Sequence, residues 1–165
     1  MTAVSTFSRL WTNLEILEDE TLFLSSKGAL TYAELREDVL SLHWALKDKG
    51  WQHIGIYCED SYAFCVAFLA SILSGAKLSI LPQRGENFLA LIQSHLDGLI
   101  VDEPINTTSL PALSWKSEGC IDWVNWPDAV STFSFWTSGS TGQPKEVNKP
   151  LSAMEYEVET LERAF

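Results

Sequence analysis

The first half of the chain alternates between helical and extended patterns of hydrophobic residues. Spacings of three and four predict a second helix that begins at the capping box Thr31–Glu34, in which each side chain satisfies a backbone N–H of the other residue, and ends at Gly50. A third helix, from Asp60 or Ser61 to Gly75, is apolar on almost every face and should be buried. The first helix is amphipathic, with an apolar face formed by Phe7, Leu10, Trp11, Leu14 and Leu17.

Short hydrophobic runs bounded by glycine, proline or polar residues predict strands. We expect them at residues 22–24, 29–30, 54–58, 77–81, 99–101, 121–124, 130–136 and 145–149. Further helices are expected over 86–96 and from residue 151 or 152 onward, whereas the Pro-, Ser- and Thr-rich residues 102–117 should form a surface loop. The alternation of strands and helices predicts an α/β fold with a mostly parallel sheet and flanking helices.

Two groups of apolar side chains need partners within or beside this fold. Trp123 and Trp126 should pack in the core or a loop rather than stack on nucleic-acid bases, because no basic residues lie between them. The last helix presents glutamates to solvent on one face. Its apolar stripe requires either the sheet of this chain or material beyond its end, and consists of Leu151, Met154, Val158, Leu161 and Phe165.

Composition limits the partners of the chain. Its 165 residues form one domain or a piece of one, and a hydrophobic content of 46% is typical of a globular protein. The formal net charge of −11 argues against nucleic acid or an anionic membrane as the main partner. It does not argue against ATP, because a binding site can be positive within an acidic protein.

The cysteines and histidines are too scattered to indicate a metal site. Cys58, Cys65 and Cys120 lack zinc-knuckle spacing and indicate reduced thiols in a cytoplasmic protein. His43 is expected to be structural rather than catalytic, because no polar residue accompanies it on its helix face. The N-terminus lacks the apolar core of a signal peptide, and the most apolar run, residues 63–73, is too short to span a bilayer.

Candidate chemistry is concentrated in residues 135–145, Phe-Trp-Thr-Ser-Gly-Ser-Thr-Gly-Gln-Pro-Lys. Glycines let a backbone approach an anion closely, and successive N–H groups in such turns form an anion-binding concavity. The hydroxyls add donors, Lys145 adds a cation, and Pro144 fixes the chain just before the lysine. The predicted phosphate-binding residues are Thr137, Ser138, Gly139, Ser140, Thr141, Gly142 and Lys145.

Two other interpretations fit this stretch less well. A Walker A loop ends in Gly-Lys-Ser/Thr, whereas Lys145 lies between Pro144 and Glu146. A flexible Ser/Gly linker has no need of a Pro-Lys ending or of an aromatic strand before it. The residues therefore favour an anion-binding loop between two strands.

The nine residues from Thr137 to Lys145 closely resemble the phosphate-binding signature of the AMP-forming (adenylate-forming) ligases, which include acyl-CoA synthetases, luciferases and peptide-synthetase adenylation domains. Residues 30–35, Leu-Thr-Tyr-Ala-Glu-Leu, resemble the first core motif of that family, and residues 60–75 with the following strand resemble the second. The resemblance implies that residues 1–165 are a partial N-terminal, AMP-binding domain, without the remainder and the C-terminal lid domain.

In that family the loop holds the β- and γ-phosphates of ATP while a carboxylate attacks the α-phosphate. The resemblance implies a fatty or aryl acid as substrate, activated as an acyl-adenylate, and the thiol of coenzyme A or of a carrier protein as acceptor. Family members carry a magnesium-binding Glu, a ribose-binding Asp and a catalytic Lys downstream. The resemblance therefore implies ATP and Mg²⁺ as cofactors, no catalytic residue within 1–165, and no activity of these residues alone.

One position departs from the family pattern. Most members have Gly after the Pro-Lys, where this chain has Glu146, and its Pro-Lys-Glu-Val-Asn-Lys-Pro ending resembles divergent acyl ligases of fatty-acid and polyene biosynthesis. Neighbours in a strand point to opposite faces, so Glu146 either points away from the phosphates and leaves Lys145 usable, or faces the phosphates and repels them. Two other functions stay open: a non-catalytic remnant that binds nucleotide, pyrophosphate or a protein partner, and a structural domain whose loop is coincidental.

Overall fold

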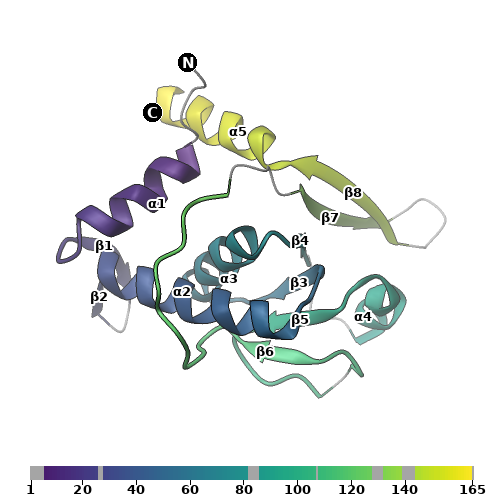
Figure 1. Ribbon diagram of the computed structural model, residues 1–165. Helices are drawn as coiled ribbons and strands as arrows, with labels where there is room; N and C mark the ends of the chain where they lie inside the picture. Colours follow the sequence, from purple (N-terminus) through teal and green to yellow (C-terminus); the bar gives the residue numbers. More distant parts are fainter. Residues whose placement is uncertain are drawn as a thin grey trace.

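The computed structural model describes residues 6–25, 28–81, 86–106, 108–127, 132–138 and 144–164, and it confirms the predicted α/β fold (Figure 1). The helices are α1 (Thr6–Ile16), α2 (Tyr32–Lys49), α3 (Ser61–Ser74), α4 (Glu86–Ile92), followed by a 3-10 turn over Gln93–His95, and α5 (Leu151–Ala164). The strands are β1 (Thr21–Ser25), β2 (Gly28–Thr31), β3 (His53–Tyr57), β4 (Lys77–Ile80), β5 (Gly98–Val101), β6 (Ala112–Ser114), β7 (Thr132–Ser138) and β8 (Pro144–Pro150).

Six strands form the central sheet, in the order β6-β5-β3-β4-β7-β8, and β1 and β2 form a separate antiparallel pair. All neighbours in the large sheet are parallel except β7 and β8, which form an antiparallel hairpin at one edge. The helices cover both faces of the sheet. Trp11, Leu42 and Ile72 of α1, α2 and α3 form one hydrophobic cluster with Phe133 of β7, whereas α4 forms a second cluster with Trp136.

Local signals set the ends of α2 and α3 as predicted. The N–H of Thr31 donates to the Glu34 carboxylate at 2.8 Å, and the N–H of Glu34 donates to the Thr31 hydroxyl at 3.2 Å, which completes the capping box. Gly50 and Gly75 end the two helices with φ values of 66° and 76°. This left-handed conformation favours glycine, which has no Cβ.

The sequence prediction is wrong in the region between β5 and β7. Residues 112–114, which we assigned to a surface loop, form β6 and pair in parallel with β5, whereas residues 121–124 form no strand. The 3-residue β6 is too short to show a hydrophobic alternation, and its pairing depends on the free edge of β5. The predicted helix over 86–96 is also shorter, since α4 ends at Ile92 and gives way to the 3-10 turn.

Residues 115–127 instead pass along the helices as an extended segment (Figure 1). The indole N–H of Trp11 donates to the Val124 carbonyl at 2.7 Å, and the Trp123 ring stacks on Trp11 with 4.9 Å between centroids. Trp126 stacks on Phe7 with a centroid distance of 6.4 Å. The packing role predicted for Trp123 and Trp126 is therefore confirmed.

Helix α5 lies beside α1 (Figure 1). Leu151 is buried, and Met154 packs against the main hydrophobic cluster, whereas Leu161 is 59% exposed. The backbone N–H of Phe7 donates to the Glu155 carboxylate at 3.2 Å, so this glutamate is not simply solvated as predicted. Among the described residues, the apolar stripe thus packs on the helical layer around α1 through Leu151 and Met154, and Leu161 faces solvent.

Gly98 allows β5 to pass closely beneath the ring of Trp51. A Cβ atom at Gly98 would lie 2.4 Å from two carbon atoms of that ring, closer than non-bonded atoms approach. We therefore expect Gly98→Ala to lower the free energy of unfolding by about 1–3 kcal/mol, measured by urea denaturation. Combining it with Trp51→Leu should recover most of this cost, and equal costs of Gly98→Ala in the two backgrounds would contradict the steric explanation.

Candidate phosphate-binding hairpin

Strands β7 and β8 carry the two described ends of the predicted phosphate loop. Thr137 and Lys145 lie opposite each other in the antiparallel register, and Ser138 lies opposite Pro144. The structure thus brings both ends of the motif together and confirms the strands on either side of it. The remaining predicted residues lie outside the described part of the chain, and they are Gly139, Ser140, Thr141 and Gly142.

The parallel pairing determines at which edge of the sheet the hairpin turns. Strand β7 is parallel to β4, with Phe135 opposite Ile80, and β4 is parallel to β3. Ser138, the last residue of β7, therefore lies at the edge formed by the carboxyl ends of these strands. Open α/β sheets bind ligands outside this edge, so the predicted loop starts where a ligand is expected.

Lys145 and Glu146 occupy opposite faces of β8, because neighbouring residues of a strand alternate. Lys145 is exposed, and so is Thr137, whose hydroxyl donates to the Lys145 carbonyl at 3.4 Å. Glu146 is half-buried and pairs in register with Trp136, which packs on the α4 side of the sheet. The side chains of Lys145 and Glu146 therefore point to opposite faces of the sheet, with Glu146 on the α4 side.

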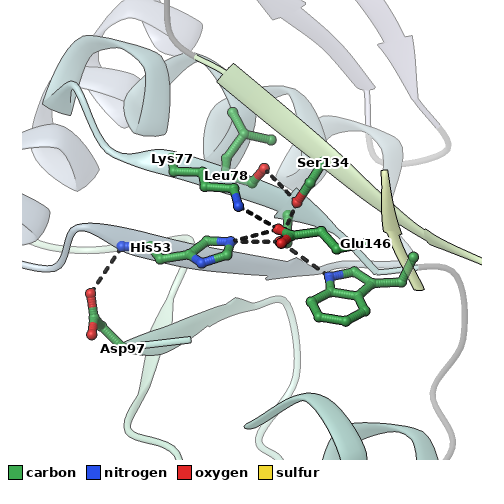
Figure 2. Close-up of polar contacts among 8 residues, drawn as sticks. His53, Lys77, Leu78, Asp97, Ser134 and Glu146 are labelled. Carbon is green, nitrogen blue, oxygen red and sulfur yellow. Dashed lines mark hydrogen bonds and ion pairs between the residues drawn. The ribbon is translucent and has the colours of Figure 1, made fainter. Parts of the chain in front are cut away.

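Glu146 reaches across the hairpin to the first residues of β3 and β4 (Figure 2). One of its carboxylate oxygens lies 2.5 Å from the Lys77 ammonium and 3.6 Å from Nε2 of His53. Burial raises the pKa of Glu146, but the Lys77 ammonium and the Ser134 hydroxyl outweigh this effect and lower the pKa overall. The carboxylate is therefore ionised, and its charge is compensated on the face opposite Lys145.

A chain of buried polar groups lies behind this ion pair. The His53 ring nitrogen lies 2.8 Å from the Ser79 hydroxyl, which lies 2.6 Å from the Ser134 hydroxyl and accepts the indole N–H of Trp136 at 3.2 Å. Burial and the nearby Lys77 lower the pKa of His53, although Glu146 acts in the opposite direction. The imidazole is therefore neutral at pH 7. It is hydrogen-bonded to the Ser79 hydroxyl and adds no charge to the cluster.

A cavity of about 550 Å³ lies outside the carboxyl ends of β3 and β5. Several of its carboxylates have structural roles: Asp60 caps α3 by accepting the N–H of Ala63 at 2.9 Å, and Asp102 accepts the N–H of Glu59 at 2.6 Å and that of Asp60 at 2.8 Å. This lining is mostly acidic, with Lys116 among it, and is therefore unfavourable for phosphate. The carboxylates that line the cavity are Glu34, Glu37, Asp38, Asp60, Asp102 and Glu103.

Within the described ranges, no group of three or more His, Cys, Asp or Glu side chains is arranged to hold a metal ion. No helix in the same part of the chain has the length and apolar content needed to cross a membrane.

No protein-family model and no curated protein match this chain, whereas solved structures do. The N-terminal subdomain of Klebsiella oxytoca NpsA, in complex with 3-hydroxybenzoyl-AMSN, matches with a TM-score of 0.64 and 21% identity over 87% of this chain and 40% of that chain. The o-succinylbenzoate CoA synthetase MenE of Bacillus subtilis, in complex with the acyl-adenylate intermediate OSB-AMP, matches with a TM-score of 0.65 and 18% identity over 86% of this chain and 41% of that chain.

A third match is PA1221, an NRPS protein containing adenylation and PCP domains, with a TM-score of 0.68 and 17% identity over 93% of this chain and 34% of that chain. These likenesses show that the chain has the fold of the N-terminal subdomain of adenylate-forming enzymes. The chain spans only about two fifths of the NpsA and MenE chains that it matches, 40% and 41% respectively.

Proposed function

We propose that this chain is the N-terminal part of an AMP-forming acid–thiol ligase, and that the loop between β7 and β8 binds the phosphates of ATP. The main support is the position of the Thr137–Lys145 motif. It joins two strands at the carboxyl edge of the sheet, in a fold shared with adenylate-forming enzymes. A coincidental match would not be expected to fall at this edge.

In this proposal the chain holds the leaving pyrophosphate. Lys145 supplies a positive charge, Thr137 supplies a hydroxyl, and the Ser/Gly residues between them supply backbone N–H donors. ATP, when bound, supplies the adenylyl group that the acid accepts. Catalysis of such a transfer consists mainly of positioning and charge neutralisation, which is what these residues offer. Mg²⁺ would be bound by groups outside the described residues, because these contain no cluster of ligands for it.

For the carboxylic-acid substrate and the thiol acceptor, the proposal names a chemical class. NpsA binds 3-hydroxybenzoyl-AMSN and MenE binds OSB-AMP, which supports an aryl acid beside the fatty acid suggested by the motif ending. MenE is a CoA synthetase and PA1221 contains a PCP domain, so coenzyme A and a carrier protein are both acceptors to test. Turnover belongs to a longer protein in this proposal, and residues 1–165 alone should form no acyl-adenylate.

Two lysines of β8 provide a matched test. Lys145 lies at the loop end of the strand, whereas Lys149 lies over the Phe135 ring and pairs with Glu157 at 3.3 Å. We expect Lys145→Gln to lower ATP–pyrophosphate exchange by the full product of the gene about 10- to 150-fold, because a charge-assisted hydrogen bond contributes about 1.5–3 kcal/mol. Lys149→Gln should change exchange less than about twofold, since an exposed ion pair contributes little.

Equal effects of the two substitutions would contradict the assignment of Lys145. Binding of MgATP by the full gene product without any exchange activity would instead favour the alternative function, a non-catalytic nucleotide-binding domain. Absence of both binding and exchange would leave a structural domain as the best account of the fold.

A further inference from the structure

Strand β8 is the edge strand of the sheet, and all seven of its residues are in register with β7. It pairs with β7 alone, and no strand lies against its outer edge within the described residues. The register of a strand is weakly specified where both of its faces are polar, as in the Pro-Lys-Glu-Val-Asn-Lys-Pro sequence of β8, and a shift by one residue turns every side chain to the other face. The orientation of Lys145 therefore depends on whatever holds β8 in its observed register.

The side chain of Glu146 makes an interaction that can keep β8 in this register. From β8 its side chain passes over Ser134 of β7 to Lys77 of β4, and the neutral His53 ring of β3 lies 3.6 Å from the same oxygen, so the ion pair with Lys77 is the charged link across the sheet (Figure 2). The oxygen that meets Lys77 has almost no exposed surface, which makes this contact stronger than an ordinary surface ion pair.

The same charges disfavour the alternative register. A shift of β8 by one residue would turn Lys145 toward the α4 side of the sheet, where Lys77 and His53 lie. The shift would bring the ammonium groups of Lys145 and Lys77 together. It would also move the Glu146 carboxylate away from Lys77, to the opposite face of the sheet. The attraction between Glu146 and Lys77 thus favours the observed register. The repulsion between Lys145 and Lys77 disfavours the shifted register, as in interfaces that exclude a competing arrangement.

We propose that Glu146 is a positioning residue: its ion pair with Lys77 fixes the register of β8 and thereby directs Lys145 to the opposite face, beside Thr137. Glu146 stands where the resembling family most often has glycine, so the device belongs to this sequence rather than to the general motif. The register claim stands on the contacts of Glu146 alone. Its consequence for phosphate binding rests on the proposed function.

Hydrogen exchange and NMR of residues 1–165 test the register directly. In Glu146→Gln and in Lys77→Met we expect the exchange protection of the β8 amides to fall about tenfold, while the amides of β3 and β5 change less than about twofold. The cross-strand NOEs between Thr137 and Lys145 should weaken, which a general loss of stability would not cause. The double variant should lose no more than either single variant, because both remove the same interaction.

The matched control is Glu157→Gln, which removes the exposed partner of Lys149 and should leave the β8 protection unchanged. Unchanged protection and NOEs in both single variants, or additive losses in the double variant, would overturn the proposal. In the full gene product, Glu146→Gln should raise KM for ATP about tenfold with little change in kcat. If Lys145→Gln has no effect on exchange while the NMR differences persist, the proposed function fails and the register role stands.

Discussion

Replacing Trp11 by alanine should lower the free energy of unfolding by about 3–5 kcal/mol, measured by urea denaturation. The indole is 1% exposed, stacks on Trp123 at 4.9 Å and lies 6.4 Å from Trp126. Its N–H is also the donor to the Val124 carbonyl. The substitution therefore leaves a cavity between α1 and the extended segment 115–127, and it removes one of the hydrogen bonds that hold this segment, beside those donated by Ser41 and Trp44 of α2.

A second substitution at the same position separates packing from hydrogen bonding. Trp11→Phe keeps an aromatic ring but removes the N–H group, so we expect it to cost about 1–2 kcal/mol. A cost below about 1 kcal/mol for Trp11→Ala would contradict the view that α1 and the segment 115–127 stabilise each other. Equal costs for the two substitutions would show that the hydrogen bond, and not the packing, makes the contribution.

Acid should destabilise the fold through His43. The side chain is 3% exposed, and burial, helped by nearby Lys47, lowers its pKa from 6.5 to about 4. The unfolded chain therefore binds a proton at a higher pH than the folded chain. The stability that depends on a neutral His43 is fully present above pH 6.5 and is lost as the pH falls from 6.5 toward 4, by about 3 kcal/mol in total.

The variant His43→Leu isolates this effect from the titration of the carboxylates. We expect the difference in unfolding free energy between the native chain and His43→Leu to be constant between about pH 7 and pH 8, above the ordinary histidine pKa. Between pH 6.5 and pH 4 the difference should shift by about 3 kcal/mol in favour of the variant. Parallel stability curves for both proteins over the whole range would show that His43 accepts a proton in the folded state as readily as in the unfolded one.

Most of the fold follows from local sequence, because its elements are long or clearly bounded. The capping box at Thr31, the glycines Gly50 and Gly75 and the apolar runs of the parallel strands predict the helices and the sheet. The short β6 was missed for the opposite reason. It has 3 residues, and only the neighbouring β5 makes it a strand. The apolar residues around Trp123 look like a strand but pack against helices instead.

The candidate site also combines residues that are adjacent in the sequence with residues that meet only in the folded chain. The sequence identifies the motif that ends at Lys145, because all its residues are adjacent. The cluster of His53, Lys77 and Glu146 was not predicted, since these residues meet only after four strands have paired. Its one local signal is the presence of Ser79 and Ser134, two hydroxyls flanked on both sides by apolar residues of their strands, which indicates a buried polar network.

The contact between α1 and α5 has a consequence for synthesis on the ribosome. The Phe7 amide and the Glu155 carboxylate that it contacts are 148 residues apart in the chain. At an elongation rate of about 5–20 residues per second, about 7–30 s pass between the synthesis of Phe7 and that of Glu155. During that time the face of α1 that α5 later covers is open to solvent and to chaperones. Helices α1 and α5 can therefore pack together only after α5 has been synthesised.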